Sequence, residues 1–184
     1  MQILGISGSL RTGSYNTALV RAAGELLQRE PLQSANAALV LAPIDALPLY
    51  SQDLENNFPA SAAALKEKIR AADALIISTP EFNRSIPAAL KNVLEWTTRP
   101  SGDNVWVGKP VLVLGASSGQ LGTAVAQYDL KRILTYLGAR VLGQPEFFLG
   151  LAAEKFDASG ALTDEKTKEF LAKALTAFVA FAAK

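Results

Sequence analysis

The chain has 184 residues, of which 49% are apolar and 19% charged, and its formal net charge is +1. This length and composition are typical of one compact domain, and the near-neutral charge argues against broad nucleic-acid or membrane binding. The chain contains no cysteine and no histidine, which excludes disulfides, zinc thiolate sites, thiol nucleophiles and Ser-His-Asp hydrolysis. If the protein is an enzyme, we expect a bound cofactor to supply the difficult chemistry, and we expect no metal site.

The sequence also gives an expectation for the compartment. No apolar run is long enough for a membrane-spanning helix. The first strand-like run begins almost at Met1, which leaves no room for a signal peptide. We therefore expect a cytoplasmic protein.

Short apolar runs alternate with helical patterns along the chain. Strand-like runs lie at 2–6, 38–42, 74–79, 111–116 and, more weakly, 139–142, and helical patterns lie at 15–29, 61–71, 87–97, 122–137 and 164–182. Several runs are apolar at consecutive positions, which is typical of strands covered on both faces. Five alternations predict one α/β domain over residues 1–184, with a five-stranded parallel sheet between helices.

The first strand-like run leads into a loop of small and polar residues. Ser9, Thr12, Ser14 and Asn16 offer neutral hydrogen-bond donors, and Arg11 offers a charged planar group. The helix that follows adds its unpaired N–H groups. These contents favour a single phosphate, because the loop lacks the lysine of a Walker motif and the glycine spacing of a Rossmann turn. The alternative is an ordinary turn in which a side chain merely caps the helix.

Two further loops follow the third and fourth strands. The stretch 80–87 is stiffened by Pro80 and Pro87, and Asn83 tolerates unusual backbone angles. The stretch 115–123 is rich in glycine, which allows a flat ring to approach closely. In a sheet of order 2-1-3-4-5, these loops and the first loop meet at one edge, where such folds bind ligands. A plain turn that starts the next helix is the alternative for 80–87.

Other stretches carry weaker expectations. The irregular stretch 43–60 is long for a compact domain, which is typical of a functional loop, although Tyr50 in it can equally be an anchor. Thr163 is a plausible cap for the last helix. The helix 122–137 is expected to bury a broad apolar face, made of Leu121, Val125, Tyr128, Leu130, Ile133, Leu134 and Leu137.

Three motifs in order along the chain resemble the NADPH-dependent FMN reductase family. They are Gly8-Ser9-Leu10-Arg11-x-x-Ser14-x-Asn16, Pro80-Glu81-Phe82-Asn83 and Gly115-Ala116-Ser117-x-Gly119. Leu47-Pro48-Leu49-Tyr50-x-x-Asp53, Lys91-Asn92 followed by Trp96, and Gly108-Lys109-Pro110 also look like that family. The resemblance covers residue 1 to about residue 140, and it implies a flavodoxin-like fold that binds FMN.

The family pattern also implies which residues hold the cofactor. By this pattern Ser9, Arg11, Ser14 and Asn16 hold the phosphate, Pro80, Glu81, Phe82 and Asn83 wrap the isoalloxazine ring, and Ser117 and Gly119 touch the ribityl chain or ring edge. The family often has tyrosine at the position of Phe82, so a hydroxyl is missing there.

The resemblance implies an enzyme that passes hydride from NADPH or NADH through bound FMN to quinones, flavins, azo dyes or chromate. No side chain is expected to be a catalytic residue, because the flavin N5 carries the hydride. Arg84 and Arg99 are candidates for contact with the NADPH 2′-phosphate. A homodimer or homotetramer is expected, with Tyr128 and Glu146 as candidate contacts. The alternatives are a flavodoxin-type electron carrier, against which the net charge of +1 argues, and a nucleotide-sensing domain without turnover.

Overall fold

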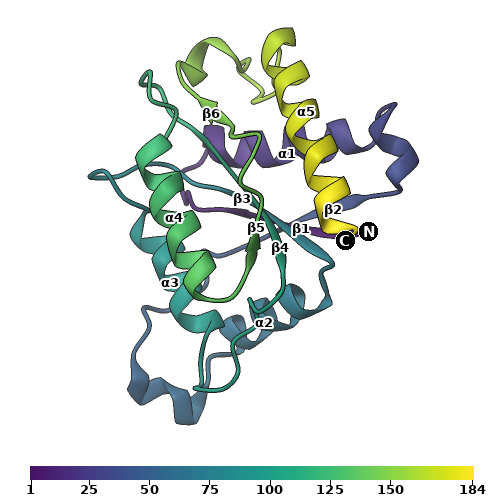
Figure 1. Cartoon of the computed structure of the whole chain (residues 1–184). Helices are drawn as coiled ribbons and strands as arrows, with labels where there is room; N and C mark the ends of the chain where they lie inside the picture. The colour runs from purple at the N-terminus through teal and green to yellow at the C-terminus, as the bar shows by residue number, and fades with distance from the viewer.

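The computed structural model describes residues 1–184 apart from the side chain of Ser34. Its strands are β1 (Gln2–Ser7), β2 (Ala38–Ala42), β3 (Ala74–Ser78), β4 (Pro110–Ala116), β5 (Arg140–Val141) and β6 (Phe148–Leu149). Its α-helices are α1 (Tyr15–Leu27), α2 (Ala60–Ala71), α3 (Ala88–Thr97), α4 (Ala124–Tyr136) and α5 (Glu165–Ala182), as Figure 1 shows. Short 3₁₀ turns lie at Leu32–Ala35, Gln52–Asn57 and Ala152–Glu154.

The sheet is parallel and its strands follow the order β2-β1-β3-β4-β5, which confirms the predicted order. The carboxyl ends of β1 and β3 therefore lie side by side, and β4 follows them. The strand β6 was not predicted. It pairs with β4 at Gly115 and Ala116, beyond the short stretch where β5 pairs at Pro110 and Val111. Two strands of two residues thus share the edge beside β4.

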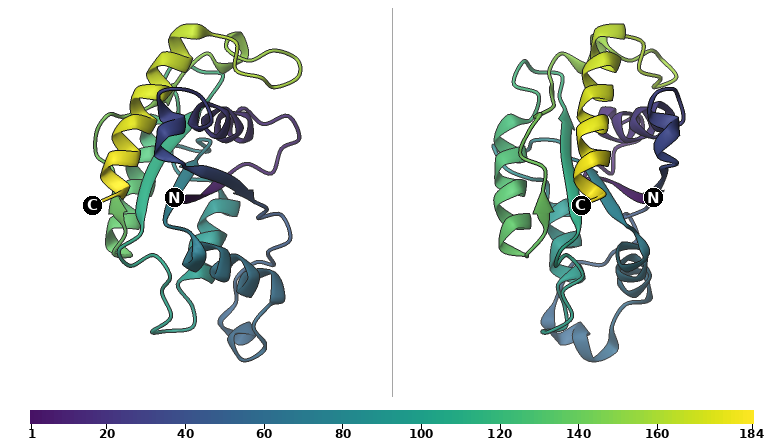
Figure 2. Two further views of the ribbon diagram at one scale, coloured as in Figure 1. Left: turned by 90° about the vertical axis from the view of Figure 1, so that its right-hand side faces the viewer. Right: turned by 45° about the vertical axis from the view of Figure 1, so that its right-hand side comes forward.

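Helices cover both faces of the sheet (Figure 2). On one face α1 and α5 pack against the strands, with Leu19 and Phe178 among the fully buried side chains. On the other face α2, α3 and α4 do so, with Ile69 and Val93 fully buried. Every residue of β3 is buried, as its continuous apolar run predicts, and each large side chain buried in this way contributes about 1.5–3 kcal/mol. Among the described residues, the helices include none that is long and apolar enough to cross a membrane.

Two expectations about helices are wrong in detail. The cap of α5 is Asp164 rather than Thr163, because the Asp164 carboxylate accepts from the Thr167 N–H at 2.9 Å. In and just before α4, Leu121, Val125 and Tyr128 are 54%, 41% and 55% exposed. The helix instead buries a narrower stripe on its sheet side, which comprises Ala126, Gln127, Leu130 and Leu134.

The long stretch between β2 and α2 is fastened to α3. The Pro48 carbonyl accepts from Asn92 Nδ2 at 2.9 Å and from Trp96 Nε1 at 2.7 Å. The Tyr50 N–H donates to Asn92 Oδ1 at 2.8 Å. The Asn92 and Trp96 side chains thus substitute for the regular backbone pairing that this stretch lacks, and these contacts favour the anchoring interpretation of Tyr50.

Candidate functional site

A cavity of about 430 Å³ lies where the loops after β1, β3 and β4 meet. The predicted site residues except Asn83 and Gly119 lie on its wall. Its full lining comprises Ser9, Arg11, Ser14, Tyr15, Asn16, Pro80, Glu81, Phe82, Ala116, Ser117 and Ser118. The fold thus brings together the three motifs that lie far apart in the sequence.

The loop between β1 and α1 presents unpaired hydrogen-bond donors. Ser14 caps α1, and its Oγ accepts from the Asn16 N–H at 3.2 Å, while Ser9 Oγ accepts from the Arg11 N–H at 3.3 Å. The backbone N–H groups of residues 12–15 have no acceptor within the part of the chain that the structure describes. Four free donors in a row at the positive end of a helix form a suitable environment for an anion.

Arg11 adds a full positive charge to this loop. Its guanidinium donates to the Gly13 carbonyl at 2.9 Å, and its Cζ lies 5.5 Å from the centre of the Tyr15 ring. The side chain is otherwise exposed. The cation is therefore held over the loop on the solvent side, where it can close on a ligand.

Asn16 has a different surrounding from its neighbours in the motif. Its carboxamide is buried, and Oδ1 accepts from Ser78 Oγ at 2.9 Å and from the Ala116 N–H at 3.0 Å. Its Nδ2 donates to the Ala116 carbonyl at 2.9 Å. One side chain on α1 thereby ties together the ends of β3 and β4, which fixes the positions of the three loops relative to one another.

Glu81 joins the second loop to α4. Its Oε2 accepts from the backbone N–H groups of Val125 at 3.1 Å and Ala126 at 3.2 Å, and Oε1 lies 3.1 Å from Arg84 Nη1. Thr123, at the N-cap position, has a positive φ of 66° and makes no side-chain cap. Glu81 therefore supplies the cap for α4 from 44 residues away. Local sequence signals could not reveal this contact.

Residues Phe82 to Ser85 form a tight hairpin in the second loop. Their backbones exchange two hydrogen bonds of 3.0 Å, and Asn83 and Arg84 have φ values of 52° and 63°. These angles indicate a two-residue turn of the I′ kind and confirm the unusual backbone expected at Asn83. Phe82 is 58% exposed at the mouth of the cavity.

The hairpin is also held at its far end. Ser85 Oγ donates to Asp129 Oδ2 on α4 at 2.5 Å. The bond from Ser85, and then the ion pair with Arg132, hold the pKa of Asp129 below its usual value. The hairpin is thus attached to α4 through both Glu81 and Ser85, although it carries no regular strand.

The third loop is held by the stretch that contains β6. The Ser117 N–H donates to the Leu149 carbonyl at 2.9 Å, and the Gly119 carbonyl accepts from the Leu151 N–H at 3.1 Å. At Gly115, an added Cβ would lie 2.7 Å from the Thr79 carbonyl oxygen. A glycine there lets the ends of β3 and β4 approach each other closely.

The arginines suggested for a 2′-phosphate both have acidic partners. Arg84 is paired with Glu81. Arg99 Nε lies 3.8 Å from Glu55 Oε1, and its guanidinium lies over the Tyr50 ring at 5.7 Å. The Tyr50 hydroxyl donates to Glu55 at 2.6 Å. Arg99 and Tyr50 therefore belong to a cluster around Glu55, and neither lies on the wall of the three-loop cavity.

Tyr128 and Glu146, suggested as contacts with a second copy, meet within the chain. The Tyr128 hydroxyl donates to Glu146 Oε2 at 2.9 Å, and Lys131 Nζ lies 2.8 Å from Glu146 Oε1. These bonds, that from Lys131 first, lower the pKa of Glu146. The group forms a small polar cluster on the exposed side of α4.

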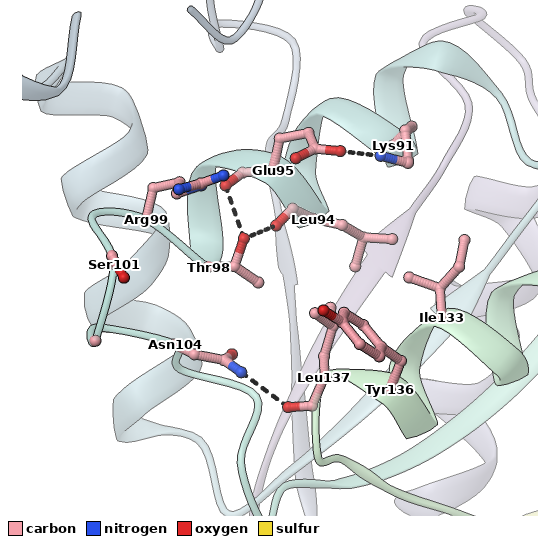
Figure 3. Close-up of a pocket in the computed structure, with 11 residues that line it drawn as sticks. Lys91, Leu94, Glu95, Thr98, Arg99, Ser101, Asn104, Ile133, Tyr136 and Leu137 are labelled. Atoms are coloured by element: carbon pink, nitrogen blue, oxygen red, sulfur yellow. Dashed lines mark hydrogen bonds and ion pairs between the residues drawn. The ribbon is translucent and has the colours of Figure 1, made fainter. Parts of the chain in front are cut away.

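A larger cavity, of about 540 Å³, lies between the carboxyl-terminal halves of α3 and α4 (Figure 3). Several of its polar groups bond to one another or to the backbone: Lys91 pairs with Glu95, Thr98 Oγ1 donates to the Leu94 carbonyl at 3.0 Å, and Asn104 Nδ2 donates to the Leu137 carbonyl at 2.9 Å. It includes none of the free donors of the first loop. The three-loop cavity is therefore the candidate site.

Comparisons with known proteins identify the family of this chain. Residues 1–154 match the model of the family described as NADPH-dependent FMN reductase. The chain is 42% identical over 178 residues to an NAD(P)H-dependent FMN reductase of Pseudomonas aeruginosa, covering 96% of this chain and 92% of that protein. It is 40% identical over 184 residues to a quinone reductase of Escherichia coli K12, covering 98% and 95%.

A solved structure supports the same assignment. The flavoenzyme NAD(P)H:(acceptor) oxidoreductase FerB from Paracoccus denitrificans superposes with a TM-score of 0.89 at 38% identity, covering 99% of this chain and 97% of that one. This likeness confirms the flavodoxin-like fold. The chain therefore belongs to the NADPH-dependent FMN reductase family, whose oxidoreductases use FMN and NAD(P)H.

Proposed function

We propose that the three-loop cavity binds FMN, and that the enzyme oxidises NADPH or NADH and reduces quinones or other small oxidants there. The observation that carries this proposal is the row of free N–H groups at residues 12–15 beside Arg11. Such donors match the oxygens of one terminal phosphate. The rest of the cavity wall comes from the loops after β3 and β4.

The donor set fits FMN without any further group. In our proposal the Ser9 and Ser14 hydroxyls and the free N–H groups hold the phosphate, and Arg11 closes over it from the solvent side. Asn16 acts as a positioning residue, since its carboxamide already bonds to Ser78 and Ala116. Bound FMN would supply the two-electron chemistry, for which this chain has no cysteine thiol.

The second and third loops hold the ring in this proposal. Pro80 and Phe82 offer apolar surface, and the backbone of Glu81 and Asn83 offers polar groups to the ring edge. Ser117 also lines the cavity, and a Cβ added at Gly119 would meet only the Ser117 hydroxyl, at 3.9 Å. The exposed Phe82 leaves the mouth open, so that a nicotinamide and then an oxidant can reach the same place in turn.

Quinones are the proposed oxidant because two kinds of observation agree. The relative from E. coli is named a quinone reductase. The mouth of the cavity presents the apolar side chain of Phe82 and no free carboxylate, since the Glu81 oxygens are bonded to α4 and Arg84. A flat neutral ring fits such a mouth better than a charged substrate.

The test is anaerobic mixing of the flavin-loaded protein with NADPH alone. We expect the yellow colour to disappear, added quinone to restore it, and steady-state rates to follow ping-pong kinetics, because both substrates use one place in turn. Flavin released by heat should run as FMN on chromatography. Persistent colour with excess NADPH and NADH would favour a flavodoxin-type carrier, and release of FAD would contradict the FMN assignment.

We further propose that the protein is cytoplasmic, where reduced nicotinamide nucleotides are available, and that it forms a homodimer or homotetramer. Leu121, Val125, Tyr128 and Tyr136 are exposed on one side of α4 and the loop before it, and exposed apolar side chains gathered on one helix face are typical of an interaction surface. Sedimentation of the purified protein and of the Val125→Arg variant tests the assembly. A monomeric wild-type protein would contradict it.

A further inference from the structure

A second cavity lies on the outer side of the first loop. It has a volume of about 470 Å³ and is formed by that loop, α1 and residues 157–160. Figures 1 and 2 show the stretch that precedes α5 beside α1. Arg11, Ser14 and Tyr15 line both this cavity and the candidate FMN cavity. The two cavities therefore adjoin the same loop, and we call this second one the outer cavity.

The outer cavity contains a cation that forms no ion pair with any described residue. Arg21, on α1, lines it, is exposed, and makes no ion pair or hydrogen bond through its side chain within the described part of the chain. Arg11 contributes a second guanidinium, which donates to the Gly13 carbonyl, a neutral acceptor. Because Arg11 is shared with the FMN cavity, Arg21 is the guanidinium that remains for a second group with concentrated negative charge.

One carboxylate also lines the outer cavity. Asp157 Oδ1 accepts from the Ser159 N–H at 2.8 Å, Ser159 Oγ at 2.6 Å and the Ala161 N–H at 3.0 Å. Its Oδ2 makes no hydrogen bond among the described residues. With Arg11 assigned to FMN, the outer cavity keeps one cation, Arg21, and one carboxylate, Asp157. Asp157 Oδ2 is free to accept from a neutral hydroxyl or amine, such as those of a ribose or an adenine.

We propose that the outer cavity binds the 2′-phosphorylated adenosine half of NADPH, and that Arg21 distinguishes NADPH from NADH. The proposal rests on the function proposed above, in which the nicotinamide occupies the mouth of the FMN cavity. The 2′-phosphate is the one group that NADH lacks, and a guanidinium is suited to it by charge and by its planar fork of donors. Arg84 and Arg99, the candidates from the sequence, are already paired with Glu81 and Glu55.

The test compares Arg21→Ala with Arg29→Ala in the flavin-loaded protein. Arg29 lies beyond the same helix, also has no ion pair among the described residues, and lines a different cavity, so its loss is a matched loss of one positive charge. We expect Arg21→Ala to raise the KM for NADPH about tenfold and to leave the KM for NADH and the FMN content unchanged, and we expect Arg29→Ala to change none of these values. Arg11 is unsuitable for this purpose because it is assigned to FMN.

A binding measurement tests the outer cavity without requiring the enzyme to turn over. Adenosine 2′,5′-bisphosphate, which carries no nicotinamide, should bind the wild-type protein more tightly than adenosine 5′-monophosphate in calorimetry, and Arg21→Ala should abolish the difference. Equal losses for NADPH and NADH, or a difference in binding that survives Arg21→Ala, would overturn the proposal. Failure of wild-type protein to oxidise either nucleotide would instead contradict the proposed function, while the bisphosphate titration would still report on the outer cavity.

Discussion

Arg11 is held at the entrance of the site by weak contacts. The Gly13 carbonyl and the Tyr15 ring keep its guanidinium over the first loop, yet the side chain stays exposed. Its charge is therefore available to a ligand without breaking a strong bond in the protein. The neighbouring donors at residues 12–15 are fixed by the start of α1 and have no such freedom.

Loss of the Arg11 charge should weaken FMN binding. We expect Arg11→Ala to raise the dissociation constant for FMN about tenfold. A charge-assisted hydrogen bond contributes about 1.5–3 kcal/mol, and the exposed position of Arg11 favours the lower value of that range. Titration of the flavin-free protein with FMN measures the effect. Arg132→Ala, which removes an arginine paired with Asp129 on α4, serves as control. An unchanged dissociation constant for Arg11→Ala would mean that this side chain is only a surface charge.

Glu81 gives a second test at the scale of one residue. Its side chain is 11% exposed and accepts from two N–H groups at the start of α4. Glu81→Ala leaves both donors without an acceptor, so we expect a loss of about 1–2 kcal/mol in the free energy of unfolding. Denaturant unfolding of the flavin-free protein measures it. Glu67→Ala, at a 69% exposed position, should cost under about 0.5 kcal/mol, and equal losses in the two variants would argue against the cap.

Among the elements, α2 is locked to the loop before β4 by a buried lysine. Lys66 is 3% exposed, and its Nζ donates to the Asp103 carbonyl at 2.9 Å and pairs with Asp103 Oδ2 at 2.7 Å. Arg70 on the same helix also pairs with Asp103. The bond from Lys66 and then that from Arg70 hold the pKa of Asp103 below its ordinary value of 3.8. One acidic group thus receives two cations from one helix.

This arrangement predicts a dependence of stability on pH. The pKa of Asp103 is lower in the folded protein than its unfolded value of 3.8. Its carboxylate therefore contributes stability above pH 3.8, and that contribution is lost as the pH falls below 3.8 and through the folded pKa. Asp103→Asn should therefore lower the unfolding free energy at pH 7 and flatten its fall between about pH 5 and 3. Denaturant unfolding at several pH values measures both. Asp45→Asn, at an exposed position without an ion pair among the described residues, should leave the slope unchanged.

The elements also show what a sequence can predict. The long strands and helices follow from apolar periodicity, and their order follows from the way parallel sheets are connected. The strands β5 and β6 have two residues each, too few to show a period. The weak run at 139–142 predicted the first, and no strand was predicted at the second. The cap by Glu81 and the bonds of Asn16 join positions far apart along the chain, so no local pattern marks them. Sequence reasoning therefore predicted which loops come together, but not that Asn16 and Glu81 hold them in place.

At the scale of the whole molecule, the site lies across the middle of the sheet rather than within one unit. Its wall draws on loops that follow β1, β3 and β4. A ligand bound there contacts segments that separate on unfolding. Binding should therefore stabilise the entire fold and not one corner of it.

FMN should raise the melting temperature more than riboflavin does. Ligand at 100 times its dissociation constant adds about 2.7 kcal/mol to the free energy of unfolding. Riboflavin lacks the phosphate that the free donors of residues 12–15 are proposed to hold, so the same concentration should give a much smaller shift. Thermal unfolding with equal concentrations of each compound measures the difference. Equal shifts would mean that the phosphate contributes nothing to binding.

The bonds of Asn16 also bear on the order of events during synthesis. Its partners lie 62 and 100 positions later in the chain, at Ser78 and Ala116. A nascent chain that has made β1 and α1 alone has neither partner, so the loops cannot yet assume their final spacing. Contacts of such long separation close late in folding. We therefore expect flavin uptake to begin only after β4 has been synthesised and has paired in the sheet. The yellow colour would then report that the central sheet is complete.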